Sequence, residues 1–335
     1  MADTIPPKRK VNSRDVAERA GVSRSAVSRT FTDGASVSEA TRNKVMDAAL
    51  ELGYRVNALA RSLNNQRSDL VGLVAADMDN PFRSEQIDCL SKCLQEHGFK
   101  PRLLRPDATT NVTNMIGAML QYSVAGVIVT SDTPPEQICI ECQLHGVPLV
   151  TINKQDPGAP VDRVQCDFTG GGRMAFDHLH AEGCRRLALV QPEKPSYTIA
   201  GRARAFAEAR TNASLPLLTF NSGAQDYASG LEAARHVAAH AAEIDGIFCV
   251  ADYMALGLLD GLRHDYGLNI PQDLRLIGFD DIPQAGWKAY DLTTIRHSRE
   301  DLAAKAIELL IRRIDCPELP SQKLVCPLDL VRRSS

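Results

Sequence analysis

The sequence predicts a small all-helical N-terminal domain followed by an α/β body of two doubly wound lobes. Hydrophobic residues recur at helical spacing over residues 12–53. From residue 69 onward, fully apolar runs alternate with amphipathic stretches, which is typical of parallel sheets covered by helices on both faces. The 335 residues, 44% of them hydrophobic, suffice for a sizeable core and a small accessory domain.

Residues 12–53 divide into three short helices. Short polar residues that favour helix N-caps precede them, namely Asn12 or Ser13, Ser23 and Ser38. Gly21 breaks the chain between the first two helices, and Gly53 ends the third. A helix, a tight glycine turn and a second helix are the geometry of a helix-turn-helix.

Strands and helices are expected to alternate through the body. Apolar runs that predict strands lie at residues 70–76, 125–129, 148–152, 186–190, 246–250 and 274–279. Stretches of helical period lie at 84–97, 170–182, 226–240 and 252–265. We expect two sheets rather than one. A ligand would bind in the cleft between them, beyond the carboxyl ends of the strands.

The charge is divided unevenly along the chain. Residues 1–67 carry 12 Lys and Arg against 7 Asp and Glu, whereas the remainder carries 26 against 34. This asymmetry is expected when only the N-terminal part meets a polyanion such as DNA.

Several classes of protein lack support in the sequence. No run approaches the ~18 apolar residues of a membrane span, and no apolar run of a secretory signal follows the basic residues 1–10. We therefore expect a cytoplasmic protein without a membrane partner. Among nine cysteines only Cys139 and Cys142 have CxxC spacing, so we expect buried thiols, no metal and no cofactor. A redox switch is the alternative for this pair.

Short motifs follow one another along nearly the whole chain. The first part carries Asp15-Val16-Ala17, Ala20-Gly21-Val22-Ser23, Val27-Ser28-Arg29, Leu52-Gly53-Tyr54 and residues 57–63. The body carries Asn80-Pro81-Phe82, Gly171-Gly172, Asp252-Tyr253-Met254-Ala255-Leu256-Gly257, Gly278-Phe279-Asp280-Asp281 and Leu292-Thr293-Thr294-Ile295. In these motifs and their order the chain resembles the LacI/GalR family of bacterial regulators.

The resemblance implies a homodimer that binds a pseudo-palindromic operator in double-stranded DNA and responds to a small-molecule effector. Residues 1–56 would form the headpiece, 57–68 the hinge helix and linker, and 69–335 the effector-binding and dimerisation domain. The body would have a periplasmic-binding-protein-like fold, with lobes of residues 69–160 plus 297–325 and of residues 161–296. Repression is the commoner outcome in the family. The sequence ends without a heptad tail for a tetramer, so we expect a dimer.

In this family the second helix lies in the major groove. Arg24 and Ser25 correspond to the positions that touch bases, and Arg24 can bond guanine O6 and N7, with a phosphate contact as the alternative. Ala26 could meet a thymine methyl, and Arg29 is a second candidate that faces DNA. The other candidates, which hold phosphates or only cap helices, are Asn12, Ser23, Ser28 and Thr41, together with Tyr54 of the family motif.

Residues 57–63 resemble the family's hinge helix, which enters the minor groove beside its partner. Leu63 matches the leucine that wedges between base pairs, with a core contact as the alternative. Ala60 would permit close approach of the two helices, and Asn57 begins the segment. The family usually has proline before Asn57, where this chain has Val56, so hinge folding is expected to depend more on DNA.

The family's effector pocket maps onto Phe82, Asn153, Arg202 and Asp280. Phe82 would form an apolar wall, while Arg202 and Asp280 would bond ligand polar groups. Ala251 stands where sugar sensors often carry Asn, and the contact it lacks could come from Tyr197 or Gln225. The expected effector is a sugar, with a sugar acid, a nucleoside or another metabolite left open. Capping by Asp281 and a surface pair of Arg204 are structural alternatives.

Two other functions compete with a regulator. A sugar-binding transport protein would share the body, but it would need a signal peptide and no basic head. An enzyme is not expected because no G-x-S-x-G, H-E-x-x-H or P-loop motif is present. The run Gly170-Gly171-Gly172 also lacks the G-x-G-x-x-G spacing of a nucleotide cradle.

Overall fold

The computed structural model describes residues 11–31, 35–54, 68–106 and 110–335. The chain forms two compact units, residues 1–68 and 69–335. Each unit has hydrophobic clusters of its own. Within the described ranges, no helix has the length and apolar character that a bilayer crossing requires.

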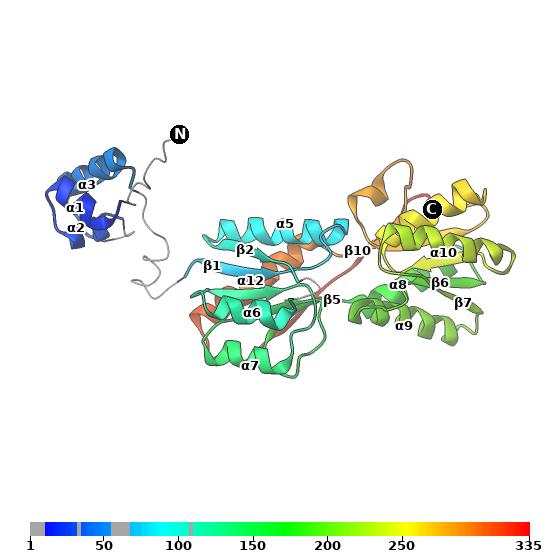
Figure 1. Cartoon of the computed structure of the whole chain (residues 1–335). Helices are drawn as coiled ribbons and strands as arrows, with labels where there is room; N and C mark the ends of the chain where they lie inside the picture. The colour runs from blue at the N-terminus through cyan, green and yellow to red at the C-terminus, as the bar shows by residue number, and fades with distance from the viewer. Residues whose placement is uncertain (1–10, 32–34, 55–67, 107–109) are drawn as a thin grey trace, which may run out of the picture. The chain divides into compact units, whose positions relative to one another are not determined.

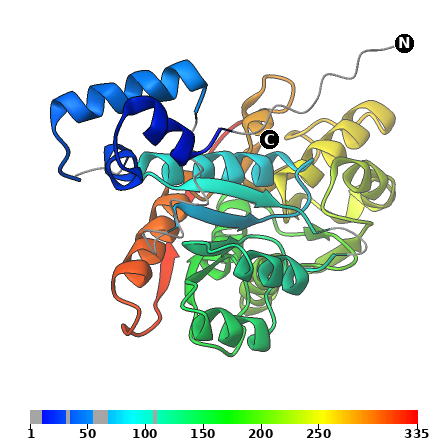
Figure 2. The same cartoon turned by 60° about the vertical axis from the view of Figure 1, so that its left-hand side comes forward.

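The described residues of the first unit form three helices, α1 (Ser13–Ala20), α2 (Arg24–Thr30) and α3 (Glu39–Leu52). The expected caps are confirmed, because Asn12, Ser23 and Ser38 each accept hydrogen bonds from N–H groups of the following first turn. Gly21 and Gly53 end α1 and α3 with left-handed backbones, which glycine adopts without strain. Figure 2 shows α1, α2 and α3 lying against one another, and their buried side chains form a small core. That core consists of Val16, Ala17, Val27, Val45, Ala48 and Ala49.

The first lobe of the second unit is a six-stranded sheet with helices on both faces. Its elements are β1 (Leu70–Val74), α5 (Pro81–Glu96), β2 (Lys100–Leu104), α6 (Val112–Leu120), β3 (Gly126–Val129), α7 (Glu136–Leu144), β4 (Leu149–Ile152), β5 (Asp162–Cys166), α12 (Arg299–Asp315) and β11 (Lys323–Cys326). The strand order is β11-β5-β4-β3-β1-β2, with all pairs parallel. Helices α5 and α12 cover one face, and α6 and α7 cover the other (Figure 1).

The second lobe repeats this architecture. Its elements are α8 (Phe168–Ala181), β6 (Leu187–Gln191), α9 (Tyr197–Asn212), β7 (Leu217–Asn221), α10 (Tyr227–Ala239), a 3-10 turn (Ala241–Glu243), β8 (Gly246–Cys249), α11 (Asp252–Asp260), a π-helical turn (Gly261–Asp265), β9 (Arg275–Asp280), a 3-10 turn (Pro283–Gly286), β10 (Thr293–Arg296) and β12 (Asp329–Val331). The strand order is β12-β10-β9-β8-β6-β7, in which only β12 is antiparallel. Helices α10 and α11 cover one face, and α8 and α9 the other.

The chain passes between the lobes three times, after β5, after β10 and after β11. The expected lobe boundary at residue 160 therefore differs from the structure, since β5 pairs with β4 in the first sheet. Residues after 326 also return to the second lobe, where β12 pairs with β10. Both differences arise because sheet pairing, rather than chain order, decides which lobe a strand joins.

The predicted fold class, and each of the six predicted strands, is confirmed. The other strands of the described residues, β2, β5, β7, β10, β11 and β12, were not predicted. Strands β2 and β7 are partly exposed edge strands. Strands β5 and β10 bury polar residues such as Gln165 and Thr294, so they lack the continuous apolar run that identifies a buried parallel strand.

Candidate functional site

The exposed side of α2 carries the candidates for base contact. Ala26 and Val27 turn into the unit, while Arg24, Ser25, Ser28 and Arg29 are exposed. The Ser23 hydroxyl accepts a hydrogen bond from the N–H of Ala26 at 3.2 Å. The first turn of the helix therefore presents Arg24 and Ser25 to the outside, as a recognition helix requires.

The arginines of α2 are not neutralised within the described residues. Arg24 and Arg29 have no ion pair there, whereas Arg14 and Arg19 of α1 pair with acids of the same unit at 3.2 and 2.6 Å. Exposed guanidinium groups without an acidic partner can bond a guanine edge or a phosphate. The exposed side of α2 thus carries two arginines that have no acidic partner among the described residues.

The structure corrects one predicted DNA contact and qualifies others. The Ala26 methyl is only 8% exposed because it faces inward with Val27, so a thymine methyl cannot pack on it. Asn12, Ser23 and Thr41 lie at helix starts, and Thr41 accepts a hydrogen bond from the Ser38 hydroxyl at 2.8 Å. Asn12 and Ser23 cap α1 and α2, whereas Thr41 caps no helix and instead donates its N–H to the cap residue Ser38.

Tyr54 follows the end of α3 and packs near Phe31, with 5.8 Å between ring centroids. Partial burial raises the pKa of its hydroxyl. The hinge predictions for Val56, Asn57, Ala60 and Leu63 fall outside the described residues.

A hollow between the two lobes brings most of the predicted effector residues together. Phe82, Asn153, Arg202, Gln225 and Asp280 all line it. The polar or charged residues that complete its lining are Arg83, Gln86, Thr130, Lys154, Ser196, Thr198 and His297. Its volume of about 50 Å³ is smaller than most small-molecule sites, so a sugar-sized ligand requires the lobes to separate.

Arg202 and Asp280 form the buried centre of this site. Arg202 Nη1 donates to Asp280 Oδ1 at 3.2 Å and to the carbonyl of Val250 at 2.8 Å. The guanidinium carbon lies 3.6 Å from the centroid of the Phe279 ring. His297 Nε2 lies 3.1 Å from the same Asp280 oxygen, and burial lowers the histidine pKa. The carboxylate therefore holds both neighbours in place.

Asn153 and Phe82 form the first-lobe side of the site. Asn153 directly follows β4 with a φ of 56°, and its Oδ1 accepts a hydrogen bond from the N–H of Cys166 at 2.8 Å. Phe82 lies in the first turn of α5, and its ring centroid is 4.4 Å from that of His297. The Phe82 ring thus forms the expected apolar wall, but it already packs against the ring of His297.

Two predicted effector residues lie outside the hollow. Tyr197 packs on Phe168 with 5.2 Å between ring centroids, because the start of α9 turns Ser196 and Thr198 inward instead. Ala251 is fully buried before α11 and does not line the hollow. Of the two residues expected to replace the contact that Ala251 lacks, Gln225 lines the hollow and Tyr197 does not.

The structure also bears on the two structural roles considered for Asp281 and Arg204, helix capping and a surface ion pair. Asp281 binds Arg333 at 2.7 Å and caps no helix. Arg204 forms an exposed pair with Glu208 one helical turn later, as expected for a surface residue.

Four residues that line the hollow were not predicted as effector residues: Lys154, Arg83, Gln86 and His297. Lys154 stands next to Asn153 at the carboxyl end of a strand, which was the available signal. Burial lowers the pKa of its ammonium group to about 8, and the nearby Arg83 acts in the same direction. Gln86 lies one turn after Phe82 on α5, so helical spacing could have identified it.

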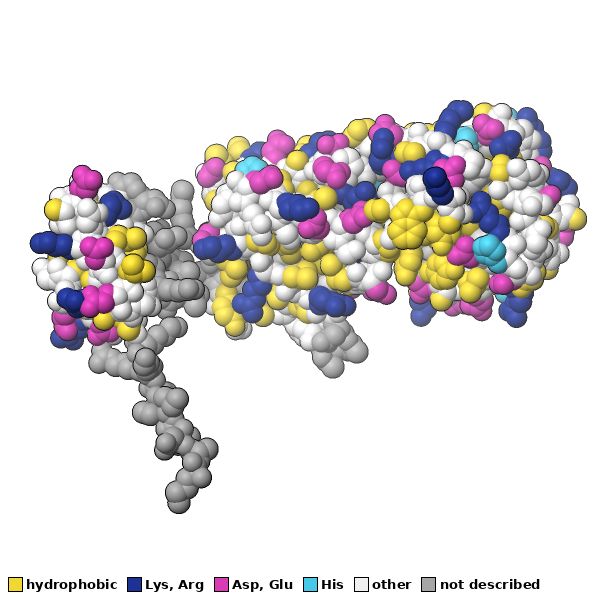
Figure 3. Space-filling model, turned by 90° about the horizontal axis from the view of Figure 1, so that it is seen from above, with side chains coloured by type: hydrophobic (Ala, Val, Ile, Leu, Met, Phe, Trp, Pro, Cys, Tyr) yellow, Lys and Arg dark blue, Asp and Glu magenta, His cyan; other side chains and the backbone are white. Residues whose placement is uncertain are grey.

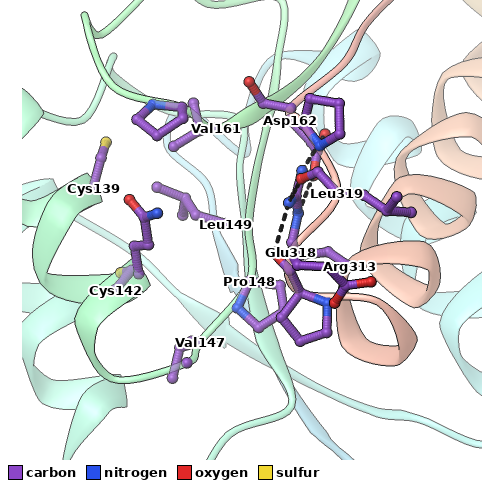
Figure 4. Close-up of a pocket in the computed structure, with 16 residues that line it drawn as sticks. Cys139, Cys142, Val147, Pro148, Leu149, Val161, Asp162, Arg313, Glu318 and Leu319 are labelled. Carbon is purple, nitrogen blue, oxygen red and sulfur yellow. Dashed lines mark hydrogen bonds and ion pairs between the residues drawn. The ribbon is translucent and has the colours of Figure 1, made fainter.

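A larger hollow of about 330 Å³ lies at the opposite ends of the first-lobe strands, where β4 and β5 begin (Figure 4). Arg313 crosses it and donates to Asp162 at 2.9 and 3.2 Å. The N–H of Gln322 also donates to Asp162 at 2.7 Å. The dashed lines in Figure 4 join Arg313 to its acceptors, whereas Gln143, Glu318 and Ser321 also line the hollow at positions nearer solvent.

All nine cysteines are free thiols. Cys139 and Cys142 are buried on α7 beside the larger hollow, and burial raises their pKa values to about 11 and about 12. Within the described part of the chain, no group of three His, Cys, Asp or Glu side chains could hold a metal ion.

Both parts of the chain match known protein families. Residues 14–57 match the bacterial regulatory proteins of the lacI family, and residues 176–335 match the periplasmic binding protein-like domain. The HTH-type transcriptional repressor PurR of Escherichia coli O139:H28 is 31% identical over 330 residues, which cover 96% of each chain.

Solved structures extend the similarity to the fold. The Lac repressor dimer bound to operator and the anti-inducer ONPF has a TM-score of 0.86 at 23% identity, covering 97% of this chain and 99% of that one. A LacI family regulator from Enterococcus faecium with bound ribose has a TM-score of 0.72 at 26% identity, covering 79% and 98%.

The N-terminal unit distinguishes between the functions that are compatible with the fold of the body alone. A match to regulatory proteins that begins in the helix-turn-helix separates this chain from transport proteins and from enzymes. Such regulators meet their DNA in the cytoplasm. The chain belongs to the LacI family of bacterial transcriptional regulators.

Proposed function

We propose that this regulator is a repressor that binds a pseudo-palindromic operator as a homodimer and is controlled by a sugar-like effector bound between its lobes. The observation that carries the proposal is the pairing of two unsatisfied sites in one chain. The first unit offers free arginines on α2, and the body offers buried polar groups in a cleft. Regulation needs both, since the effector must change what the head does.

Base reading is assigned to Arg24, with Ser25 beside it. Both are exposed in the first turn of α2, and an unpaired arginine can form two hydrogen bonds to one guanine. Arg29, one turn later, is the second candidate. Ser23, Ser28, Thr41 and Asn12 are assigned to phosphates, which fix the register without reading sequence.

The dimer is supported by exposed apolar surface on the body. Leu231, Tyr266 and Trp287 of the second lobe are 38%, 44% and 56% exposed. Figure 3 shows hydrophobic side chains gathered on one face of that lobe. Patches of this kind often mark protein interfaces, and the related Lac repressor has been solved as a dimer on its operator.

The effector site is supported by the polar lining of the cleft. Asn153, Gln225, Arg202 and Asp280 converge there from both lobes, together with two hydroxyl side chains. A polyhydroxylated ligand matches such a set because each polar group left unpaired would cost affinity. Ligand entry would separate the lobes and so alter the spacing of the two heads.

The test is binding of the full-length protein to promoter DNA upstream of its own gene, measured by fluorescence anisotropy. Arg24→Ala should weaken specific binding by about 1–3 kcal/mol, or roughly 5- to 150-fold, and relax the preference at one base pair of each half-site. Arg14→Ala, which removes an exposed arginine already paired with Glu18, is the matched control and should change little. Absence of any sequence-specific binding by the wild type would overturn the proposal.

A further inference from the structure

The cleft between the lobes holds more positive than negative charge. Three cations line it, Arg83, Lys154 and Arg202, against a single carboxylate, Asp280. Asp280 neutralises Arg202, and Arg83 pairs with Asp77 at 3.0 Å. Lys154 is left over, because none of the described residues forms an ion pair or hydrogen bond with its ammonium group.

The surroundings of Lys154 do not compensate its charge. Burial and the neighbouring Arg83 both lower the pKa of its ammonium group, to about 8, while Asp132 and Asp77 act weakly in the opposite direction. A cation that is partly withdrawn from water and has no carboxylate bonded to it is costly for the folded protein. An anion bound beside it would remove that cost.

The same cleft contains buried hydrogen-bond donors without acceptors. Arg202 Nε and Gln86 Nε2 have no partner among the described residues, although Arg202 and Gln86 are only 4% and 5% exposed. The nearest carboxylate oxygen, Oδ1 of Asp280, already accepts from Arg202 Nη1 and lies at hydrogen-bond distance from His297. His297 Nδ1 also has no partner, and it is an acceptor because the Nε2–H of the neutral ring faces Asp280. The two unpartnered donors call for acceptor oxygens on the ligand, and the single unpartnered acceptor calls for a hydroxyl group.

We propose that the effector carries an anionic group, a carboxylate or a phosphate, which binds beside Lys154 while its other oxygens accept hydrogen bonds from Gln86 and Arg202. This inference rests on the proposed function, because it takes the same site and narrows the chemistry of its ligand. A neutral sugar would cover Lys154 without supplying a counter-charge. An acidic sugar derivative would satisfy both the cation and the donors.

The position of the anionic group is limited by the adjoining hollow. That hollow, of about 150 Å³, shares Arg83 and Gln225 with the cleft but is also lined by Asp77, Asp79 and Asp226. These carboxylates would repel an anion there. The charged end of the ligand therefore belongs at Lys154, and uncharged hydroxyl groups suit the side toward the three aspartates.

The test is calorimetric titration of the full-length protein with matched neutral and acidic ligands. The pairs are ribose with ribose 5-phosphate, and glucose with glucose 6-phosphate and with gluconate; inorganic phosphate is titrated alone. At pH 7 we expect at least one acidic member to bind ten times more tightly than its neutral counterpart. The phosphate and carboxylate arms then distinguish the two kinds of anion.

Variants of Lys154 connect this preference to the residue. Lys154→Met keeps the length of the side chain but removes the charge, and it should reduce the affinity for the acidic ligand to that for the neutral one. Lys154→Arg should retain most of the preference. Lys323→Met removes an exposed lysine from β11 in the same lobe and should leave all affinities unchanged.

Each outcome bears on a different proposal. Equal or tighter binding of the neutral sugars, with release of operator DNA, would overturn the anionic effector and leave the proposed function standing. A preference for acidic ligands that survives in Lys154→Met would overturn the assignment to this residue. A wild-type protein that binds operator but no member of the panel would contradict both the anionic effector and the sugar-like ligand.

Discussion

The two hollows of the body differ in size and in what their polar groups have left to bind. The larger, about 330 Å³, contains Asp162 and Arg313, which bond each other and the surrounding backbone. The smaller, about 50 Å³, leaves the Lys154 ammonium and Arg202 Nε unpaired. Volume alone favours the larger hollow as a ligand site, whereas unsatisfied donors favour the smaller.

Their positions on the same sheet account for the difference. The larger hollow lies where β4 and β5 begin, and the cleft lies beyond the end of β4, at Asn153. In doubly wound folds the loops beyond the carboxyl ends of strands bind ligands. Asn153 and Asp280, both directly at strand ends, also have φ values of 56° and 121°, which are uncommon outside glycine and often found at functional sites.

Asp280→Ala is the change expected to have the largest effect. It would leave the guanidinium of Arg202 buried and unpaired, which typically costs about 3–5 kcal/mol of unfolding free energy. Binding of the effector should be lost as well, because the carboxylate orients Arg202 and His297. Urea denaturation monitored by circular dichroism, together with calorimetry, measures both effects.

Asp162→Ala in the larger hollow is the matched comparison. Asp162 is 1% exposed but its partner Arg313 is 15% exposed and also donates to the carbonyl of Pro317, so the arginine keeps other contacts. We expect a smaller loss of about 2 kcal/mol and unchanged effector affinity. Loss of effector binding in this variant would break the distinction between the two hollows.

Local signals explain how much of the first unit could be predicted from sequence. Caps such as Ser23 and Ser38 act on the next turn of the same helix, so a few neighbouring residues suffice to identify them. To predict which side chains of α2 are exposed, the rotation of the helix about its own axis must be known as well. Ala26 was expected to meet a thymine methyl, but it lies on the buried side of α2 together with Val27 and Thr30.

In the body, individual site residues could be predicted from the sequence, but the contacts between them could not. Arg202 and Asp280 were each expected to bond the ligand, but they bond each other across 78 positions of sequence. Lys154 escaped prediction because its significance is the lack of a partner, which only the packed structure reveals. Tyr197 was expected at the site, but it packs against Phe168, and Ser196 and Thr198 line the hollow instead.

The pH dependence of effector binding gives the next largest effect. The ammonium group of Lys154 has a pKa lowered to about 8, with Arg83, Asp132 and Asp77 as its charged neighbours. Below pH 8 the cation is present before the ligand arrives. Above pH 8 an anion must take up a proton with it, so the dissociation constant should rise by up to about tenfold per pH unit. Calorimetry between pH 7 and 9.5 in buffers of different ionisation enthalpy measures this uptake.

Lys154→Arg is the control for this dependence, since a guanidinium stays charged over the whole range. It should bind the acidic ligand with an affinity that barely changes between pH 7 and 9.5. If the slope of the wild type persists in this variant, another group is responsible and the role of Lys154 as the titrating cation is excluded.

Cys142→Ala, beside the larger hollow, is expected to have the smallest effect. The thiol is 1% exposed, but it already borders open space, so its removal enlarges an existing cavity and should cost only about 1 kcal/mol. With a pKa raised to about 12 it should also resist alkylation by iodoacetamide at pH 8 in the folded protein. Denaturation, mass spectrometry and operator binding with and without effector test these points. A large change in the effector response would show that the larger hollow is energetically coupled to the cleft. The pairing of polar groups would then no longer distinguish a structural cavity from a regulatory one.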